Sequence, residues 1–101
     1  MTARHTRQDR DVTATVGEEF VIALEANPTA GYQWEPEYDS GLLRLVDRGF
    51  SDAGAGVGSV ADEYFRWLAL ASGIVLVRFI YKRKWETTGA DEAVFRVRID
   101  D

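Results

Sequence analysis

Short apolar runs alternate with clusters of turn-forming residues along nearly the whole chain. From Asp11 onward, β-branched and aromatic residues form the runs, and Gly, Pro, Asn and Asp separate them at intervals of roughly 8–12 residues. Alternation of apolar and polar residues is typical of a half-buried β-strand, and no segment has a helical period that competes with it. The sequence therefore predicts an all-β sandwich or barrel.

Seven segments carry this alternation and are predicted to be strands. They are residues 12–16, 19–26, 32–38, 43–50, 62–70, 74–82 and 93–100. Seven strands fit one sandwich, and alternate positions predict the side chains that point into its core. These inward residues are Phe20, Ile22, Leu24, Tyr32, Trp34, Phe65, Trp67, Ala69, Val75, Val77, Phe79, Tyr81, Phe95, Val97 and Ile99. Between the fifth and sixth segments, Ser72-Gly73 predicts a tight hairpin turn, because glycine adopts the positive φ that such turns often need.

Length and charge restrict the domain count and the partners. The 101 residues, 46% of them apolar, suffice for one core, so we predict a flexible tail at residues 1–10 and one domain at 11–101. A net charge of −5 repels nucleic acid and anionic lipid, and we expect neither nucleic acid nor a membrane as partner. The polar start is no secretory signal. The protein is expected to be a monomer. Its compartment stays open: cytoplasmic for the sequence as written, and periplasmic or secreted if a leader was removed.

The chain lacks the residues that most hydrolases and metal sites require. There is no Cys, and the only His is His5 in the predicted tail, so neither a nucleophilic triad nor a zinc site can be assembled. Glu35, Glu37 and Asp39 leave a glycosidase-type carboxylate pair open, although alternate acids on a strand usually mark a solvated face. We therefore expect no enzyme activity, no metal and no cofactor.

The glycine-rich stretch Gly54-Ala55-Gly56-Val57-Gly58 suggests a nucleotide-binding loop at first sight. That fingerprint needs a strand before it and a helix after it, so that the helix terminus faces phosphate. Here residues 62–70 alternate like a strand. A hairpin connection is the simpler interpretation.

Three loops remain once the strands are drawn: the first loop at 27–31, the second at 51–61 and the third at 83–91. In the first loop, Pro28 fixes its own φ and biases Asn27 away from the helical region, while Gly31 permits a φ that side chains disfavour. Such a stiff loop loses little conformational entropy on binding. In the third loop, Arg83 and Trp85 are residue types enriched at binding hot spots.

Taken together, the three loops resemble those of the chagasin family, the immunoglobulin-like inhibitors of papain-type cysteine proteases. The matching segments are Asn27-Pro28-Thr29-Ala30-Gly31-Tyr32 followed by Trp34, then Gly54-Ala55-Gly56 ahead of the strand with Phe65, and finally Arg83-Lys84-Trp85 at the end of a long apolar strand. The resemblance spans roughly residues 12–99, and the first motif is its most specific part. The family usually has Arg-Pro-Trp where this chain has Lys84 before the Trp, which implies a less rigid third loop.

The resemblance implies a fold and an activity. The fold is a seven-stranded immunoglobulin-like β-sandwich. The activity is reversible, tight-binding inhibition of papain-like (C1 family) cysteine proteases by three loops wedged into the active-site cleft. An immunoglobulin-like adhesion or assembly module that uses the same loops for a non-protease protein partner remains the alternative.

The resemblance also implies a role for each loop. The first loop would enter the cleft over the catalytic cysteine, with Thr29 and Ala30 near the enzyme's Cys–His pair. Trp85, helped by Arg83, would pack on the primed side of the cleft. Residues 54–56 would lie extended along the unprimed subsites, and no covalent step is needed.

Overall fold

The computed structural model describes residues 3–27, 31–51 and 61–101. Over these ranges the chain forms strands β1 (Ala3–His5), β2 (Asp11–Thr15), β3 (Glu19–Ala26), β4 (Tyr32–Glu37), β5 (Leu43–Ser51), β6 (Ala61–Ala69), β7 (Gly73–Arg83) and β8 (Asp91–Asp100). Among the same residues there is no helix of the length and hydropathy needed to cross a membrane.

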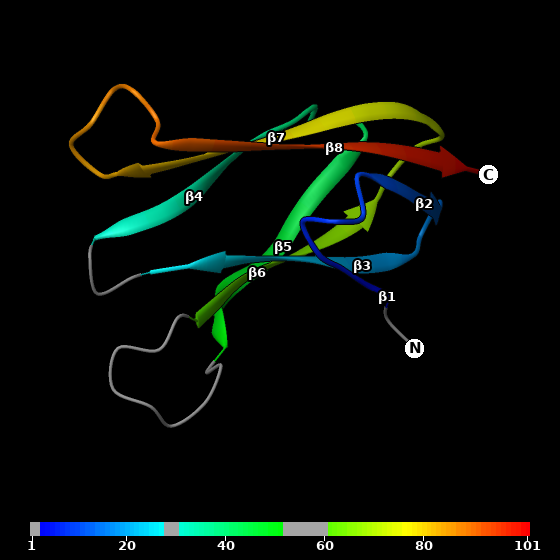
Figure 1. Cartoon of the computed structure of the whole chain (residues 1–101). Helices are drawn as coiled ribbons and strands as arrows, with labels where there is room; N and C mark the ends of the chain where they lie inside the picture. The colour runs from blue at the N-terminus through cyan, green and yellow to red at the C-terminus, as the bar shows by residue number, and fades with distance from the viewer. Residues whose placement is uncertain (1–2, 28–30, 52–60) are drawn as a thin grey trace.

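The strands form two four-stranded sheets that lie face to face (Figure 1). One sheet has the order β1-β3-β6-β5 and the other the order β2-β8-β7-β4. β1 runs parallel to β3, and β2 runs parallel to β8. The remaining neighbours are antiparallel. The prediction of an all-β sandwich is confirmed.

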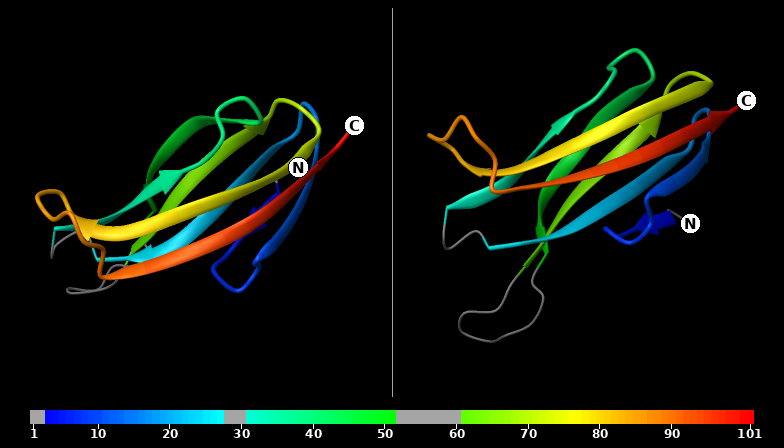
Figure 2. Two further views of the ribbon diagram at one scale, coloured as in Figure 1. Left: turned by 90° about the horizontal axis from the view of Figure 1, so that it is seen from above. Right: turned by 45° about the horizontal axis from the view of Figure 1, so that its top comes forward.

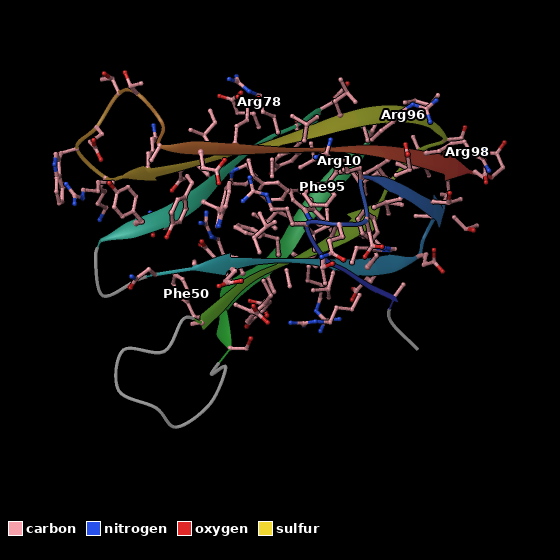
Figure 3. The ribbon with its side chains drawn as sticks, in the orientation of Figure 1. Arg10, Phe50, Arg78, Phe95, Arg96 and Arg98 are labelled. Atoms are coloured by element: carbon pink, nitrogen blue, oxygen red, sulfur yellow. The ribbon has the colours of Figure 1, made fainter. Side chains whose placement is uncertain are left out.

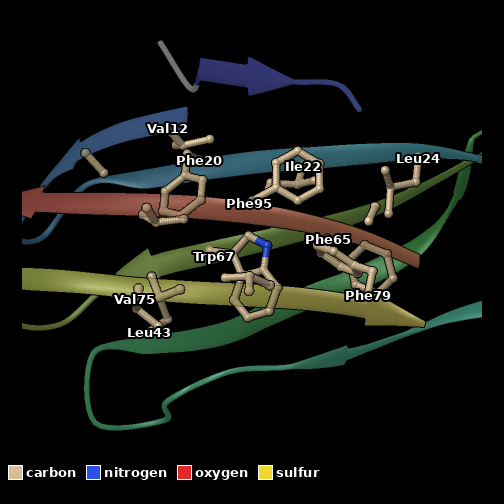
Figure 4. Packing of buried hydrophobic residues seen from close by; sticks show 14 of the residues in the cluster. Val12, Phe20, Ile22, Leu24, Leu43, Phe65, Trp67, Val75, Phe79 and Phe95 are labelled. Carbon is tan, nitrogen blue, oxygen red and sulfur yellow. The ribbon is translucent and has the colours of Figure 1, made fainter. Parts of the chain in front are cut away.

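Aromatic side chains from both sheets meet in the core (Figure 4). The ring of Phe79 on β7 lies 4.9 Å from that of Phe65 on β6 and 5.6 Å from that of Phe95 on β8, measured between centroids. All the predicted inward residues are buried except Tyr32 and Tyr81, which are half-buried. Alternation therefore identified the core face correctly, because successive strand residues point to opposite sides of a sheet.

The strand ends that flank the three predicted loops lie at one pole of the sandwich, which we call the loop pole. The end of β3 and the start of β4 lie there, together with the β5–β6 and β7–β8 junctions (Figures 1 and 2). β1 begins and β8 ends toward the opposite pole. The fold therefore presents the strand ends that flank all three loops on the same side.

Part of the segment that we expected to be a flexible tail is a strand. β1 pairs with residues 20–22 of β3, and Arg4 and Arg7 form ion pairs with Asp62 and Asp91 at 3.3 and 2.8 Å. The expectation of a tail is therefore wrong for residues 3–5, and the strands number eight instead of seven in the described part of the chain. All these partners are distant in sequence, so local alternation could not reveal a three-residue strand.

The turn at Ser72-Gly73 joins strands of different sheets. Gly73 has a φ of 145°, as expected of a glycine turn, but β6 and β7 do not pair. The predicted hairpin is therefore wrong, and the turn carries the chain across the sandwich. Both arrangements give the same alternation of buried residues, because each strand buries one face in either case.

Replacing Phe79 with Ala is expected to lower the free energy of unfolding by about 3–5 kcal/mol, because it opens a cavity between the sheets. Phe79 is fully buried and contacts rings of three neighbours. Leu76→Ala is the control, since Leu76 lies on the same strand but is 59% exposed, and it should cost less than about 0.5 kcal/mol. Urea unfolding measures both, and equal losses would contradict this account of the core.

Candidate functional site

The structure describes six of the predicted site residues. Asn27, Gly31, Lys84 and Trp85 are exposed, and Tyr32 and Arg83 are half-buried. The others, Pro28, Thr29, Ala30, Gly54, Ala55 and Gly56, lie outside the described residues. Their flanking strands β3, β4, β5 and β6 all reach the loop pole.

The exit of the first loop and the third loop are in contact. Tyr32 pairs with Arg83 across the β4–β7 ladder, so the chain on either side of this pair starts from adjacent positions. Gly31 has a φ of 83°, which confirms the expected positive φ, and a Cβ added there would lie 3.7 Å from the ring of Trp85. The exit of the first loop and the third loop therefore form one continuous surface.

Stacked side chains support Trp85 at this surface. The rings of Tyr81 and Tyr32 stack with centroids 5.0 Å apart, and the guanidinium of Arg83 lies 4.7 Å from the Tyr32 centroid and 5.9 Å from that of Trp85. Trp85 itself is 74% exposed. The arrangement presents a large aromatic surface beside a positive charge, a combination that is common at the centre of protein interfaces.

Contacts from the opposite sheet hold the entry of the first loop. The backbone N–H of Asn27 donates to the hydroxyl of Tyr81 on β7 at 2.8 Å. Two residues earlier, the carbonyl of Glu25 accepts from the indole Nε1 of Trp34 on β4 at 3.1 Å. β1 pairs only with residues 20–22, so these two side chains bind backbone groups that β1 does not reach.

An ion pair between the buried Glu63 and the partly exposed Arg48 holds the exit of the first loop. Glu63 on β6 is 1% exposed, and its Oε1 accepts from the backbone N–H of Trp34 at 2.7 Å. Nη2 of Arg48 on β5 donates to the carbonyl of Trp34 at 3.0 Å and to Oε2 of Glu63 at 3.2 Å. Both backbone groups of Trp34 are thereby satisfied at the edge of its sheet.

Sequence reasoning missed both Glu63 and Arg48. Glu63 alternates with the inward residues Phe65 and Trp67, so all three share one face of β6. A carboxylate on the apolar face of a strand was therefore the signal available in the sequence. Arg48 had none, because its direction depends on a β-bulge between Leu45 and Asp47. The extra residue puts Arg48 opposite Phe65, and directly opposed residues share a face of the sheet.

Burial raises the pKa of Glu63 above its ordinary value of 4.5. The hydrogen bonds from the Trp34 backbone and from Arg48 act in the opposite direction, and the nearby charge of Glu35 adds a smaller increase. Desolvation is the largest of these effects, because removing a carboxylate from water disfavours its charged form. The favourable contacts offset this cost only in part.

The acids that left a catalytic carboxylate pair open are engaged in separate contacts. Glu35 lies 3.9 Å from Arg48 and Glu37 lies 3.2 Å from Arg78, measured between charged atoms. Asp39 accepts from the backbone N–H of Gly41. Within the ranges that the structure covers, no group of three His or acidic residues could hold a metal ion. Nothing in this arrangement favours glycosidase chemistry.

An open groove of about 990 Å³ lies beside the entry of the first loop. Its lining mixes Arg7 and Arg10 with Glu25 and Asp62, and it ends at Asn27 and Tyr81. Charges of both signs select no single class of small ligand. The groove extends the irregular surface of the loop pole toward β1.

Comparison with protein families gives one match that covers most of the chain. The model of the chagasin family peptidase inhibitor I42 matches residues 13–99. No curated protein matches the sequence. The matched range contains all three loops and every strand except β1, the first two residues of β2 and the last residue of β8.

Several solved structures share the fold. The cysteine protease inhibitor EhICP2 from Entamoeba histolytica has a TM-score of 0.82 at 19% identity, covering 97% of this chain and 94% of that one. Amebosin has a TM-score of 0.62 at 19% identity, with 99% and 97% covered. PbICP-C, solved in complex with falcipain-2, has a TM-score of 0.69 at 18% identity, with 99% and 92% covered. The predicted immunoglobulin-like sandwich is confirmed.

The raised pKa of Glu63 predicts how stability changes with pH. The folded state holds the Glu63 proton more tightly than the unfolded state, so this group contributes stability below pH 4.5 that is lost as the pH rises through the folded pKa. Gln at this position does not titrate. The free energy of unfolding of the wild type minus that of Glu63→Gln should therefore decrease as the pH is raised from 4.5 toward neutrality.

Urea unfolding at a series of pH values measures this difference. Glu37→Gln is a matched control, because it removes the same charge from an exposed position on the neighbouring sheet. A difference that increases with pH for Glu63→Gln would contradict the assignment of desolvation as the dominant effect.

Proposed function

This chain belongs to the chagasin family of peptidase inhibitors, and we propose that it inhibits papain-like cysteine proteases reversibly and tightly with the three loops of the loop pole. The structural relative PbICP-C was solved in complex with falcipain-2, and EhICP2 is a cysteine protease inhibitor. The family relationship and this shared fold support the choice of target class.

One observation carries the proposal: the exit of the first loop lies against Trp85 of the third. A Cβ added at Gly31 would lie 3.7 Å from the ring of Trp85, and the β5–β6 junction that bears the second loop lies at the same pole. A cleft between two protease domains requires several loops that project together from a rigid base. Such pre-formed surfaces change shape little on binding and typically bury about 1,600 Å² in total.

In this mechanism the first loop fills the centre of the cleft and blocks it without a covalent step. Thr29 and Ala30 lie over the enzyme's Cys–His pair, and Gly54, Ala55 and Gly56 follow the unprimed subsites. Trp85 and Arg83 contact the primed side. Burial of the exposed indole removes apolar surface from water, and the stacking of Arg83 limits the side-chain entropy that is lost.

Titration of papain with the purified protein tests the proposal. The wild type should abolish peptidase activity near a 1:1 ratio, whereas an adhesion or assembly module would leave activity unchanged. Trp85→Ala and Thr29→Arg should each raise the inhibition constant by roughly 10- to 100-fold, because they remove a hot spot or add bulk at the tip.

Arg96→Ala and Arg98→Ala are controls for this titration. Figure 3 shows both side chains near the end of β8, away from the loop pole, and both are exposed. They should leave the inhibition constant unchanged. Loss of inhibition in these variants, with the fold intact by circular dichroism, would place the binding surface elsewhere.

Alanine variants of two glycines distinguish the effect of backbone strain on stability from an effect on protease binding. Gly31 and Gly17 have φ of 83° and 88°, so alanine at either should lower the free energy of unfolding by about 1 kcal/mol. Only Gly31→Ala should also weaken inhibition of papain, because Gly17 lies in the β2–β3 turn at the other pole. Equal inhibition constants for the two variants would count against a role for the Gly31–Trp85 contact.

A further inference from the structure

Where they lead into the first loop, both flanking strands have one side without a strand neighbour in the described part of the sandwich. β4 ends one sheet, and β3 is covered by β1 only along residues 20–22. Edge strands have backbone groups without a ladder partner. The ends of β3 and β4 that carry the first loop would therefore be the least constrained part of the scaffold if nothing else held them.

Side chains of the opposite sheet replace the missing strand neighbours at both edges. Tyr81 and Trp34 bind backbone groups of Asn27 and Glu25 beside β3. Glu63 and Arg48 bind the two backbone groups of Trp34 on β4. Each stem of the first loop is thus fixed to the sheet that it does not belong to.

Glu63 has a second connection, because its own strand bears the second loop. β5 and β6 form the hairpin that carries that loop, and they supply Arg48 and Glu63 respectively. The carboxylate therefore bridges the exit of the first loop and the base of the second. Its contacts come from two elements: the Trp34 N–H on β4 and the Arg48 guanidinium on β5. The carboxylate of Glu35, also on β4, lies 3.9 Å from Arg48.

We infer that Glu63 is a positioning residue for inhibition, which sets the spacing of the first and second loops without touching the protease. The inference rests on the proposed function. A loop pair held at the spacing of the bound state gains little order on binding, and the ordering of loops is one of the main costs of association. Release of the constraint should appear mainly as faster dissociation, since mutations in one interface act mostly on koff.

Glu63→Gln is the direct test. The amide oxygen can still accept from the Trp34 N–H, but its NH₂ group faces the Arg48 donor, so only the bridge to β5 is lost. We expect koff from papain to rise about tenfold, with kon changed less than about threefold. Circular dichroism and thermal melting establish that the variant is folded at the assay temperature.

Val97→Ala is the control for stability alone. Val97 is fully buried on β8, between the two arginines that Figure 3 shows away from the loop pole. It should lower the melting temperature without changing koff. If Val97→Ala raises koff as much as Glu63→Gln does, or if Glu63→Gln dissociates at the wild-type rate, the inference is wrong.

Arg48→Lys provides a second variant if Glu63→Gln does not fold. Lysine keeps the charge opposite Glu63 but lacks the planar guanidinium that binds both the carboxylate and the Trp34 carbonyl. It should also raise koff, and a wild-type koff in this folded variant would contradict the inference. Failure of the wild type to inhibit papain is a different result, which would overturn the proposed function itself.

Discussion

The geometry of the loop pole depends on the carboxylate of Glu63. It accepts from the Trp34 N–H at the edge of β4, where a neighbouring strand would otherwise bind. Removal of Glu63 from water is costly, and only well-placed partners can offset the cost. Trp34 supplies a backbone donor, and Arg48 supplies a charged donor while it also binds the Trp34 carbonyl. The three residues form a closed ring that uses both backbone groups. At Trp34 the edge therefore offers no free backbone group with which another chain could pair.

This ring of hydrogen bonds exists because the β-bulge gives β5 one more residue than the segment of β6 with which it pairs. Before the bulge, Leu43 and Leu45 lie opposite Ala69 and Trp67; after it, Arg48 lies opposite Phe65, with its guanidinium 4.9 Å from the centroid of that ring. Without the extra residue, the alternation would turn Arg48 outward. The register of β5 therefore decides whether Arg48 can compensate the charge of Glu63. The usual preference for apolar inward residues is broken at the point where the two loops need a common anchor.

The alternation in the sequence was sufficient to predict seven of the strand segments and most of the core residues, since it records which side of each strand meets water. It could not reveal which strands pair, because pairing depends on residues distant in the chain. The strand at residues 3–5 and the crossing at Ser72-Gly73 were missed for this reason. At the site, the local motif around Gly31 and the type of residue at Trp85 were readable. The acid at Glu63 was visible as an exception to the pattern, whereas the role of Arg48 required the bulge.

The two ends of the described chain lie away from the pole that carries Trp85 (Figure 1). A tether joined at either end would leave from the rear of the molecule and would not cross the loops. The scaffold could therefore be attached to a solid support, a carrier or a second copy in tandem while each copy still faces outward. Tandem copies would gain avidity toward a target that presents more than one cleft, provided that the linker spans the distance between them.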